Sequence, residues 1–213
     1  MQNKHILERY LKGENLKCYN FLSTVESDGE RGYKYKAHLH WVNELKKRGQ
    51  SFRELIMSDL NDARWLVKST VSKVNLIHSS EKSAYKTALN NDDVAEGYLL
   101  ALAKLLEAGW DKTALKHYLE TPQDLNDGQF ERDKTKPTTW PIASIIPFLA
   151  RPDTFPFVKP KKVNETFTYL GLTEFKKRYQ SRPNLDTYLA VKELYLLLGQ
   201  FLKEISNKQK ISN

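Results

Sequence analysis

The sequence of 213 residues has a single cysteine, Cys18, and no proline before Pro122. One cysteine excludes an intrachain disulfide and a cysteine-based zinc site within the chain. The opening stretch MQNKHILERYLKGEN lacks the continuous apolar core of a secretion signal, and the apolar run over 142–150 is too short and too proline-broken to span a bilayer. We therefore predict a cytoplasmic, soluble protein.

Signature motifs of the common enzyme classes are also missing. The chain has no GxSxG, P-loop, GxGxxG or HExxH pattern. Their absence argues against the usual hydrolase, nucleoside-triphosphatase, dinucleotide-binding and zincin functions. We therefore predict a non-catalytic protein and expect no catalytic residue, cofactor or metal.

Two short patterns are compatible with a metal site, and the first of them with a Mg²⁺-dependent nuclease. Asp153 is followed downstream by Glu174 and Lys176, which is the PD…ExK order of a large class of Mg²⁺-dependent nucleases. Those groups must come from adjacent strands, whereas Glu174 and Lys176 fall in a predicted short helix. His38 and His40 would form a metal pair on one side of a strand, but no cysteine or carboxylate cluster supports them.

The first half of the chain shows helical periodicity, and no proline interrupts it. Over residues 58–78 the apolar positions step by three or four and the polar positions fall opposite them. The apolar set is Leu60, Ala63, Val67, Val71 and Val74, and the polar set is Arg64, Lys68, Ser72 and Asn75. Further helices are predicted from Ser79 or Ser80 to about residue 91, over 92–108 with Gly109 as C-cap, and from Asp111 to Thr121-Pro122.

The N-terminal region gives two different signals. Ile6, Leu7, Tyr10 and Leu11 suit a first helix. The Asp28-Gly29 turn and the alternation around Tyr33 and Tyr35 favour a small β-hairpin near residues 19–37. A helix over roughly 38–48 is expected to follow.

Proline is concentrated in one segment, at Pro141, Pro147, Pro152, Pro156 and Pro160. These intervals leave room for single helical turns and short extended pieces, and they exclude a central strand. The segment is nevertheless rich in isoleucine and phenylalanine, so it should pack against the helical half as a stiff, irregular wrap. After it, two short helices and a long apolar C-terminal helix are expected.

These patterns predict a mainly α protein in three regions. Residues 1–121 form a proline-free helical assembly, residues 122–139 a polar connection, and residues 140–213 the proline-spaced segment with the C-terminal helices. The last region should fold with the first as one compact domain that has a C-terminal core helix.

Residues 140–160, WPIASIIPFLARPDTFPFVKP, are followed by RPNLDTY and a leucine-rich helix. They resemble a family of bacterial hypothetical proteins whose corresponding region reads approximately W-P-x-x-T-x-x-P-F-L-x-x-P-x-x-x-x-F-x-K-P. The upstream stretch VNLIHSSEKSAYKTAL is similar to the same family, so the resemblance covers roughly two-thirds of the chain. Ser144 stands where the family has threonine. The resemblance implies a shared fold and a bacterial or phage-related origin, without a particular chemistry.

The positive charge is unevenly distributed. The formal net charge is +8, and residues 151–182 alone carry eight basic and three acidic side chains. The basic residues expected to form one surface are Lys159, Lys161, Lys162, Lys176, Lys177, Arg178 and Arg182, interleaved with aromatic residues. Such a surface would bind the phosphates of DNA or RNA in a salt-sensitive way. We therefore predict an accessory or regulatory protein that contacts nucleic acid. In the alternative interpretation, these lysines solvate the outer faces of the helices while the aromatic residues complete the core.

The main alternative is a protein–protein interaction module that does not bind nucleic acid. The C-terminal helix NLDTYLAVKELYLLLGQFLKEI has an apolar face broader than a coiled-coil seam. Burial in the protein's own core and an interface with a partner or a second copy are both compatible with that face. The sequence identifies neither the oligomeric state nor the pathway.

Overall fold

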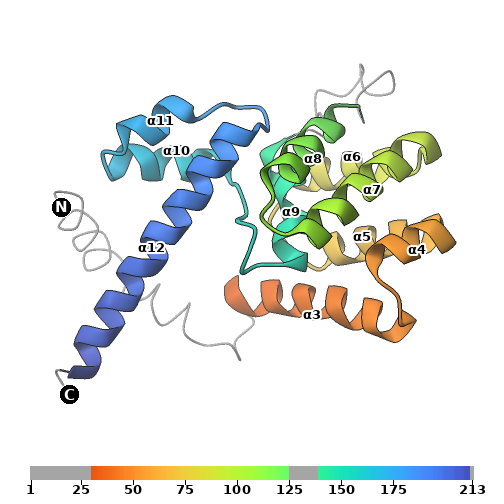
Figure 1. The fold of residues 1–213 in the computed structure, drawn as a ribbon, viewed down its shortest axis with the longest axis horizontal. Coiled ribbons are helices and arrows are strands. Elements are labelled where there is room, and N and C mark those ends of the chain that lie inside the picture. The colour runs from red at the N-terminus through yellow and green to blue at the C-terminus, as the bar shows by residue number, and fades with distance from the viewer. Residues whose placement is uncertain (1–29, 125–138, 212–213) are drawn as a thin grey trace.

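The computed structural model describes residues 30–124 and 139–211, and within these ranges every regular element is a helix (Figure 1). In chain order they are α3 (Glu30–Arg48), α4 (Phe52–Ser58), α5 (Leu60–Ser72), α6 (Ser79–Ala88), α7 (Asp92–Ala108), α8 (Lys112–Asp124), α9 (Trp140–Ala150), α10 (Pro160–Tyr169), α11 (Thr173–Arg178) and α12 (Leu185–Ile211). The predicted mainly α class is confirmed for this part of the chain. Among the described helices, none combines the length and apolarity needed to cross a membrane.

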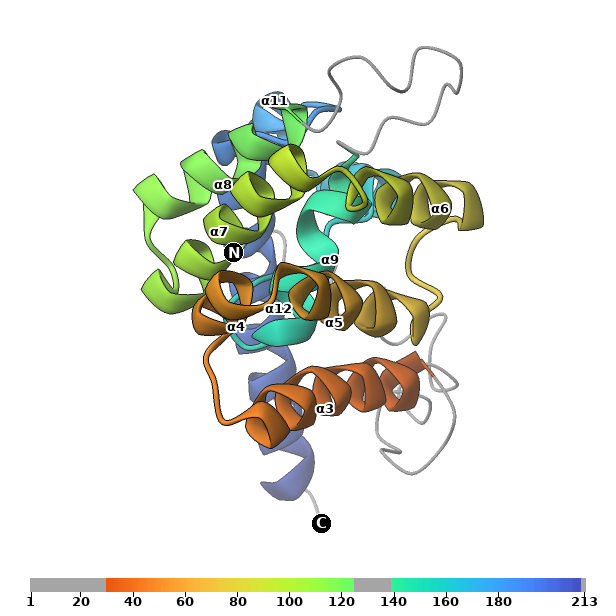
Figure 2. The ribbon, with the colours of Figure 1, turned by 90° about the vertical axis from the view of Figure 1, so that its right-hand side faces the viewer.

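Helix α9 lies at the centre of the helical body. It packs against α3, α5, α6 and α7, and Figure 2 shows α5 running between α3 and α6. Nine of the eleven residues of α9 are buried. A helix that is apolar on all sides must be covered by its neighbours to be stable in water. The most apolar stretch of the sequence therefore becomes the core around which the other helices assemble.

The conformation of α9 differs from the single turns that its prolines predicted. Pro141 lies in the first turn, where its missing N–H removes no helical hydrogen bond. Pro147 lies inside the helix and leaves the carbonyl of Ala143 without its usual donor. The hydroxyl of Tyr118, on α8, donates to that carbonyl at 2.9 Å. The helix continues through Pro147 because a side chain from a neighbouring helix replaces the backbone donor.

Tyr118 ends a chain of three buried tyrosine hydroxyls. The hydroxyl oxygens of Tyr85 and Tyr98 are 2.8 Å apart, and those of Tyr98 and Tyr118 are 3.1 Å apart. Since Tyr118 gives its only proton to Ala143, it must accept from Tyr98, which in turn accepts from Tyr85. The direction of every bond in this chain therefore follows from the missing N–H of Pro147.

Replacing Tyr118 by phenylalanine is expected to lower the free energy of unfolding by about 1–3 kcal/mol. The change leaves a buried carbonyl without a donor and the Tyr98 hydroxyl without an acceptor. Tyr85→Phe, the matched control, removes only the first donor of the chain and should cost about 1 kcal/mol. Pro147→Ala restores the N–H, so Tyr118→Phe should cost less in that background. Urea denaturation of the single and double variants measures this, and an equal cost in both backgrounds would contradict the role given to Tyr118.

After α9 the chain has no regular structure over residues 155–159, and Phe155, Phe157 and Val158 are buried. Side chains satisfy its backbone at three places: Ser144 Oγ accepts from the Val158 N–H at 2.9 Å, Tyr188 donates to the Pro156 carbonyl at 3.0 Å, and Tyr195 donates to the Phe157 carbonyl at 3.1 Å. The proline-rich segment therefore packs on the helical body as predicted, with side-chain groups in place of a β-ladder.

The first part of α12 is fixed by aromatic stacking. The Tyr188 ring stacks on Trp140 and on Trp110, with centroid distances of 6.0 and 5.8 Å. Val191 and Leu194 continue this buried face. Farther along, Tyr195, Leu196 and Leu197 are 46%, 55% and 42% exposed, and Figure 1 shows the helix extending away from the body. Over residues 185–200, where the structure describes the side chains, the predicted core helix is thus buried in its first turns and largely exposed over residues 195–197.

Three local expectations are corrected by the structure. Residues 30–37 begin α3, so the β-hairpin near residues 19–37 is wrong for that half, and residues 19–29 lie outside the described residues. The alternation around Tyr33 belongs instead to a helix that buries Ala37 and Trp41 one turn apart. Helix α8 continues through Pro122 to Asp124, because a proline in the last turn removes only one hydrogen bond.

The third correction concerns the start of α6. Its N-cap is His78 rather than Ser79 or Ser80. The His78 ring accepts from the Ser80 backbone N–H, and the Glu81 carboxylate accepts from the His78 N–H at 3.2 Å. An imidazole nitrogen thus replaces the serine hydroxyl of an ordinary capping box. The first-helix positions near Ile6, and most of the polar connection, lie outside the described residues.

Candidate functional site

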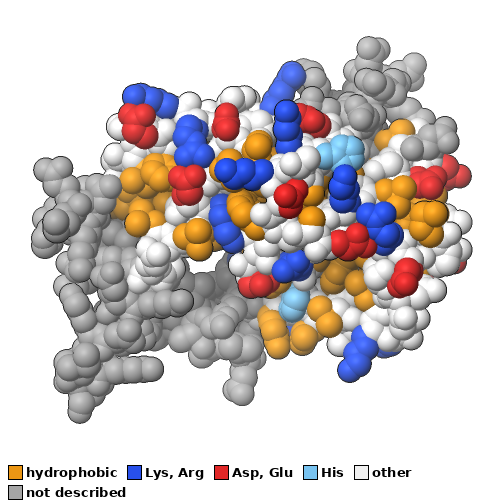
Figure 3. Space-filling view, in the orientation of Figure 1, with side chains coloured by type: hydrophobic (Ala, Val, Ile, Leu, Met, Phe, Trp, Pro, Cys, Tyr) orange, Lys and Arg blue, Asp and Glu red, His pale blue; other side chains and the backbone are white. Residues whose placement is uncertain are grey.

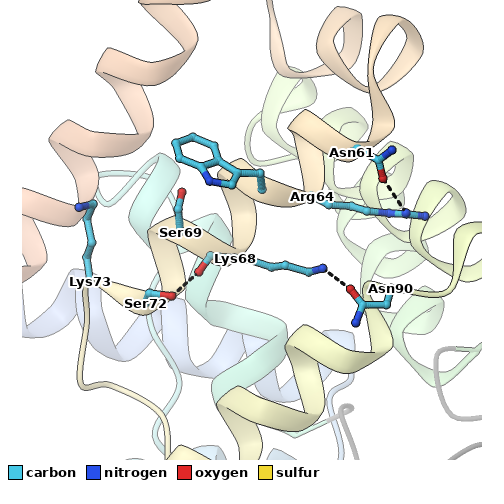
Figure 4. A pocket seen from close by; sticks show the side chains of 8 residues that line it. Asn61, Arg64, Lys68, Ser69, Ser72, Lys73 and Asn90 are labelled. Atoms are coloured by element: carbon cyan, nitrogen blue, oxygen red, sulfur yellow. Dashed lines mark hydrogen bonds between the residues drawn. The ribbon is translucent and has the colours of Figure 1, made fainter.

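The solvent-facing side of α5 carries the candidate functional site. Side chains of α5 at spacings of three and four residues, with one residue from each of the turns after α5 and α6, surround an open hollow of about 730 Å³ (Figure 4). Its lining residues are Asn61, Arg64, Trp65, Lys68, Ser69, Ser72, Lys73 and Asn90, and we call this site the α5 groove. The opposite side of α5, including Leu66 and Val67, is buried in the core. Folding of the amphipathic helix therefore points the lining residues into the groove.

Arg64 forms the floor of the groove at one end. Its side chain is 7% exposed and its guanidinium contacts the Asp92 carboxylate at 2.5 Å. It also donates to Asn61 Oδ1 at 3.2 Å. The Nε atom is buried without a hydrogen-bond partner in the part of the chain that the structure describes. Arg64 thus keeps a buried donor that no described group satisfies.

Lys68 and Lys73 supply positive charge that no carboxylate balances. Neither forms an ion pair within residues 30–124 and 139–211, and no carboxylate lines the groove. Lys68 Nζ donates to Asn90 Oδ1. Burial, followed by the charges of Arg64 and Lys86, lowers the pKa of Lys68. An anion bound in the groove would relieve this crowding of positive charge.

The two lysines lie at opposite ends of the groove. Figure 4 shows Lys68 directed toward Asn90, on the side of Arg64, and Lys73 at the opposite end of the view. Lys73 is close enough to α3 for its charge to lower the pKa of His40, after the larger effect of burial. The groove therefore has a cation at each end and polar or aromatic side chains between them.

Trp65 places a large aromatic surface in the groove, with 48% of the residue exposed. The Arg48 guanidinium lies 5.3 Å from the indole centroid, and the His40 ring meets the indole edge-on at 6.0 Å. Arg48 is held in turn by Asp62, at 2.5 and 2.7 Å, and by Glu44 at 2.8 Å. The indole is thus fixed from the α3 side while its remaining surface faces the groove.

A second hollow, of about 460 Å³, lies on the α3 side and is lined by His40, Asn43, Glu44, Lys46 and Lys47. It adjoins the α5 groove, because His40 Nε2 is 2.9 Å from Ser69 Oγ. Hydrogen bonds from Lys47 and Arg48 lower the pKa of Glu44 to about 2. Glu44 is therefore charged at neutral pH and offsets part of the positive charge of this second hollow. The α5 groove has no carboxylate among its lining residues to do the same.

The seven basic residues predicted as a nucleic-acid surface lie on α10, α11 and their flanking turns. Lys159 is the N-cap of α10, Lys161 and Lys162 follow in its first turn, Lys176, Lys177 and Arg178 form the end of α11, and Arg182 lies before α12. The two helices pack together through the rings of Phe167 and Phe175, 5.8 Å apart. That all seven side chains face one surface stays a prediction.

Four of these seven residues are paired with carboxylates. Lys161 and Lys162 approach Glu165 at 3.9 and 3.1 Å, Lys177 approaches Glu174 at 2.7 Å, and Arg178 approaches Glu193 at 3.0 Å. Figure 3 shows basic and acidic side chains close together over helices α10 and α11. We call this part of the surface, with its seven basic residues, the α10–α11 corner. Such pairing reduces the net charge that a phosphate backbone would meet. Within the described residues, Lys159, Lys176 and Arg182 form no ion pair.

The nuclease and metal patterns are not assembled in the described part of the chain. It contains no strand and no group of three histidine, cysteine or acidic residues that could hold a metal ion. Glu174 and Lys176 lie on α11, and Asp153 lies in the turn after α9. His38 and His40 lie on a helix, where residues two apart do not share a face. His38 Nδ1 is instead 2.8 Å from the Leu149 carbonyl oxygen.

The α5 groove was missed at the level of sequence. The helical periodicity predicts only that Arg64, Lys68 and Ser72 lie opposite the apolar side of the helix. The available signal was a tryptophan on the polar side of that helix, flanked by cations at helical spacing. No protein-family model, curated protein or solved structure matches this chain, and the resemblance of residues 140–160 stays a prediction.

Proposed function

We propose that this protein is a non-catalytic accessory or regulatory protein that binds nucleic acid through the α5 groove. One observation carries the proposal: Lys68, Lys73 and the half-exposed Trp65 line a groove without a carboxylate. Lysine and arginine attract phosphates, and exposed aromatic rings stack on bases. The formal net charge of +8 adds a long-range attraction for polyanions.

The α5 groove is favoured over the α10–α11 corner as the phosphate-binding site, because its lysines are not paired with carboxylates. A lysine already paired with a carboxylate must exchange that partner for a phosphate, whereas Lys68 and Lys73 have no carboxylate to lose. Lys68 also lies among positive charges that lower its pKa. We assign Lys159, Lys176 and Arg182 a secondary role, as exposed cations that extend the electrostatic footprint.

The double variant Lys68→Gln/Lys73→Gln is expected to bind nucleic acid about 10- to 50-fold more weakly near 0.1 M salt, because two phosphate contacts are lost. The dependence of log K on log salt should become shallower by about 1.4 for a single strand. Fluorescence anisotropy of a labelled oligonucleotide across a salt series measures both quantities.

Lys176→Gln/Arg182→Gln is the matched control, since it removes the same charge from the α10–α11 corner. It should weaken binding less than the groove variant does. A larger loss in the control would place the binding surface on α10 and α11. Absence of binding to any nucleic acid at low salt would overturn the proposed function. Thermal unfolding of each variant checks that the fold is retained.

The exposed apolar side chains of α12 support a second candidate function, as a protein–protein interaction module. Leu196 and Leu197 are exposed on α12, and Tyr195 beside them is 46% exposed although its hydroxyl reaches the Phe157 carbonyl. Exposed apolar clusters of this kind mark contact surfaces. This candidate predicts a partner or self-association that persists after nuclease treatment, and size-exclusion chromatography with light scattering tests it.

A further inference from the structure

We infer that the α5 groove selects single-stranded nucleic acid, with one base stacked on Trp65 and the flanking phosphates held by Lys68 and Lys73. This inference rests on the proposed function and specifies its substrate. It is carried by three features of the structure: the position of α5 between two neighbouring helices, the fixed orientation of the Trp65 ring and the cations at both ends of the groove.

The position of α5 disfavours duplex DNA. A helix that reads a duplex enters the major groove, which is only about as wide as the helix itself. Helix α5 contacts α3 on one side and α6 on the other, and Figure 2 shows it between these two helices. The neighbouring helices would meet the phosphate backbones before α5 could enter. A flexible single strand can turn an unstacked base into the hollow instead.

The Trp65 ring is organised before any ligand binds. The Arg48 guanidinium lies over the indole, 5.3 Å from its centroid. Two contacts to Asp62 and one to Glu44 hold that guanidinium in place. His40 meets the ring edge-on and is itself 2.9 Å from Ser69 Oγ. A fixed ring loses little conformational freedom when a base stacks on it, so the 48% exposure of Trp65 provides a rigid surface for stacking.

The cations lie at opposite ends of the groove that Trp65 lines. Lys68 is directed toward Asn90, and Lys73 lies at the other end. Trp65, Ser69 and Ser72 line the hollow with them. A nucleotide stacked on the indole therefore has positive charge available at both ends of the groove for its flanking phosphates. Its base edges meet the serine hydroxyls, which discriminate weakly among bases, so sequence-tolerant binding is expected.

The decisive measurement compares three fluorescent ligands of equal length at one salt concentration: oligothymidylate, a duplex, and an abasic strand with the same phosphates. Oligothymidylate should bind most tightly. Trp65→Ala should weaken its binding about 5- to 100-fold, as expected for losing one base stack. Binding of the abasic strand should change less than twofold, because its phosphate contacts remain. Trp65→Phe keeps an aromatic ring and should retain most of the affinity.

The outcomes separate this inference from the proposed function. Equal affinity for oligothymidylate and the abasic strand, or tighter binding of the duplex, would overturn single-strand selection and leave nucleic-acid binding intact. An unchanged affinity of Trp65→Ala for oligothymidylate would also overturn it. Failure to bind all three ligands at low salt would remove the proposed function itself. Circular dichroism confirms that Trp65→Ala is folded, since half of this residue is already exposed.

Discussion

Trp140→Ala is expected to lower the free energy of unfolding by about 3–5 kcal/mol, a large part of the total stability of a domain this size. The Trp140 side chain is 0% exposed and begins α9. Its ring stacks on Tyr188 with an interplanar angle of 11°, and its Nε1–H donates to the Gln180 carbonyl at 2.8 Å. Alanine leaves a cavity and an unpaired carbonyl, and it removes the contact that joins α9 to α12 and to the link before α12.

Trp140→Phe separates the two parts of this effect. Phenylalanine keeps an aromatic ring against Tyr188 and loses the indole N–H, so it should cost less than alanine. Urea-induced unfolding followed by far-UV circular dichroism measures both variants. A cost below about 1 kcal/mol for alanine, the typical value for an average substitution, would show that α12 is held to the body by other contacts.

Local periodicity was sufficient to predict the helices of the proline-free half. The apolar repeat through Ala63 and Val67 located α5, and Gly109 ends α7 with φ of +66°. Gly171, with φ of +64°, follows α10 in the same way. Such positions favour glycine because a Cβ is strained there. These features depend on a few neighbouring residues, so the sequence displays them directly.

The proline rules failed where a distant residue compensates for the missing donor. Pro147 should interrupt a helix, yet the Tyr118 hydroxyl serves the carbonyl of Ala143, 25 residues farther along the chain. No local pattern shows that α8 packs beside α9 at this point. The predicted wrap was consequently right about burial and wrong about the conformation of residues 140–150.

The candidate site was harder to predict because its parts come from separate helices. The charge excess of residues 151–182 is visible in the sequence, but the pairing of Arg178 with Glu193 depends on the packing of α11 against α12. Conversely, Lys68 becomes notable only when folding brings Asn90, 22 residues away, beside it. Arg48 likewise reaches Trp65 only because α3 packs against α5. Charge counts along the chain show neither which cations are paired with carboxylates nor which distant residues fold beside them.

Raising the pH above about 11 is expected to destabilise the protein steeply. Burial raises the pKa of Tyr85, Tyr118 and Tyr188 well above the ordinary value, whereas in the unfolded chain these groups ionise near pH 10. Above that pH the unfolded state binds fewer protons than the folded state, so the free energy of unfolding falls as pH rises. Each tyrosine contributes about 1.4 kcal/mol per pH unit, and the three together about 4 kcal/mol per unit.

Partly buried lysines act in the opposite direction over a narrower range. Burial lowers the pKa of Lys68, Lys82 and Lys192. Between those lowered values and the unfolded pKa near 10.4, the unfolded state binds more protons than the folded state, and stability rises with pH. This gain stops once the unfolded lysines are neutral. The loss from the tyrosines continues beyond that point, so the net effect above about pH 11 is destabilising.

Tyrosinate absorbance during an alkaline titration distinguishes this mechanism from simple surface ionisation. Exposed tyrosines should titrate gradually near pH 10, and the buried ones should ionise together with the loss of helical circular dichroism. In Tyr85→Phe, one buried group is gone while Tyr118 still serves Ala143, so the slope of stability against pH should become shallower by about 1.4 kcal/mol per pH unit. Gradual ionisation of all eleven tyrosines with the helical signal intact would mean that the hydroxyls of Tyr85, Tyr118 and Tyr188 are accessible to solvent. That result would contradict both their burial and the hydrogen-bonded chain that carries α9 through its internal proline.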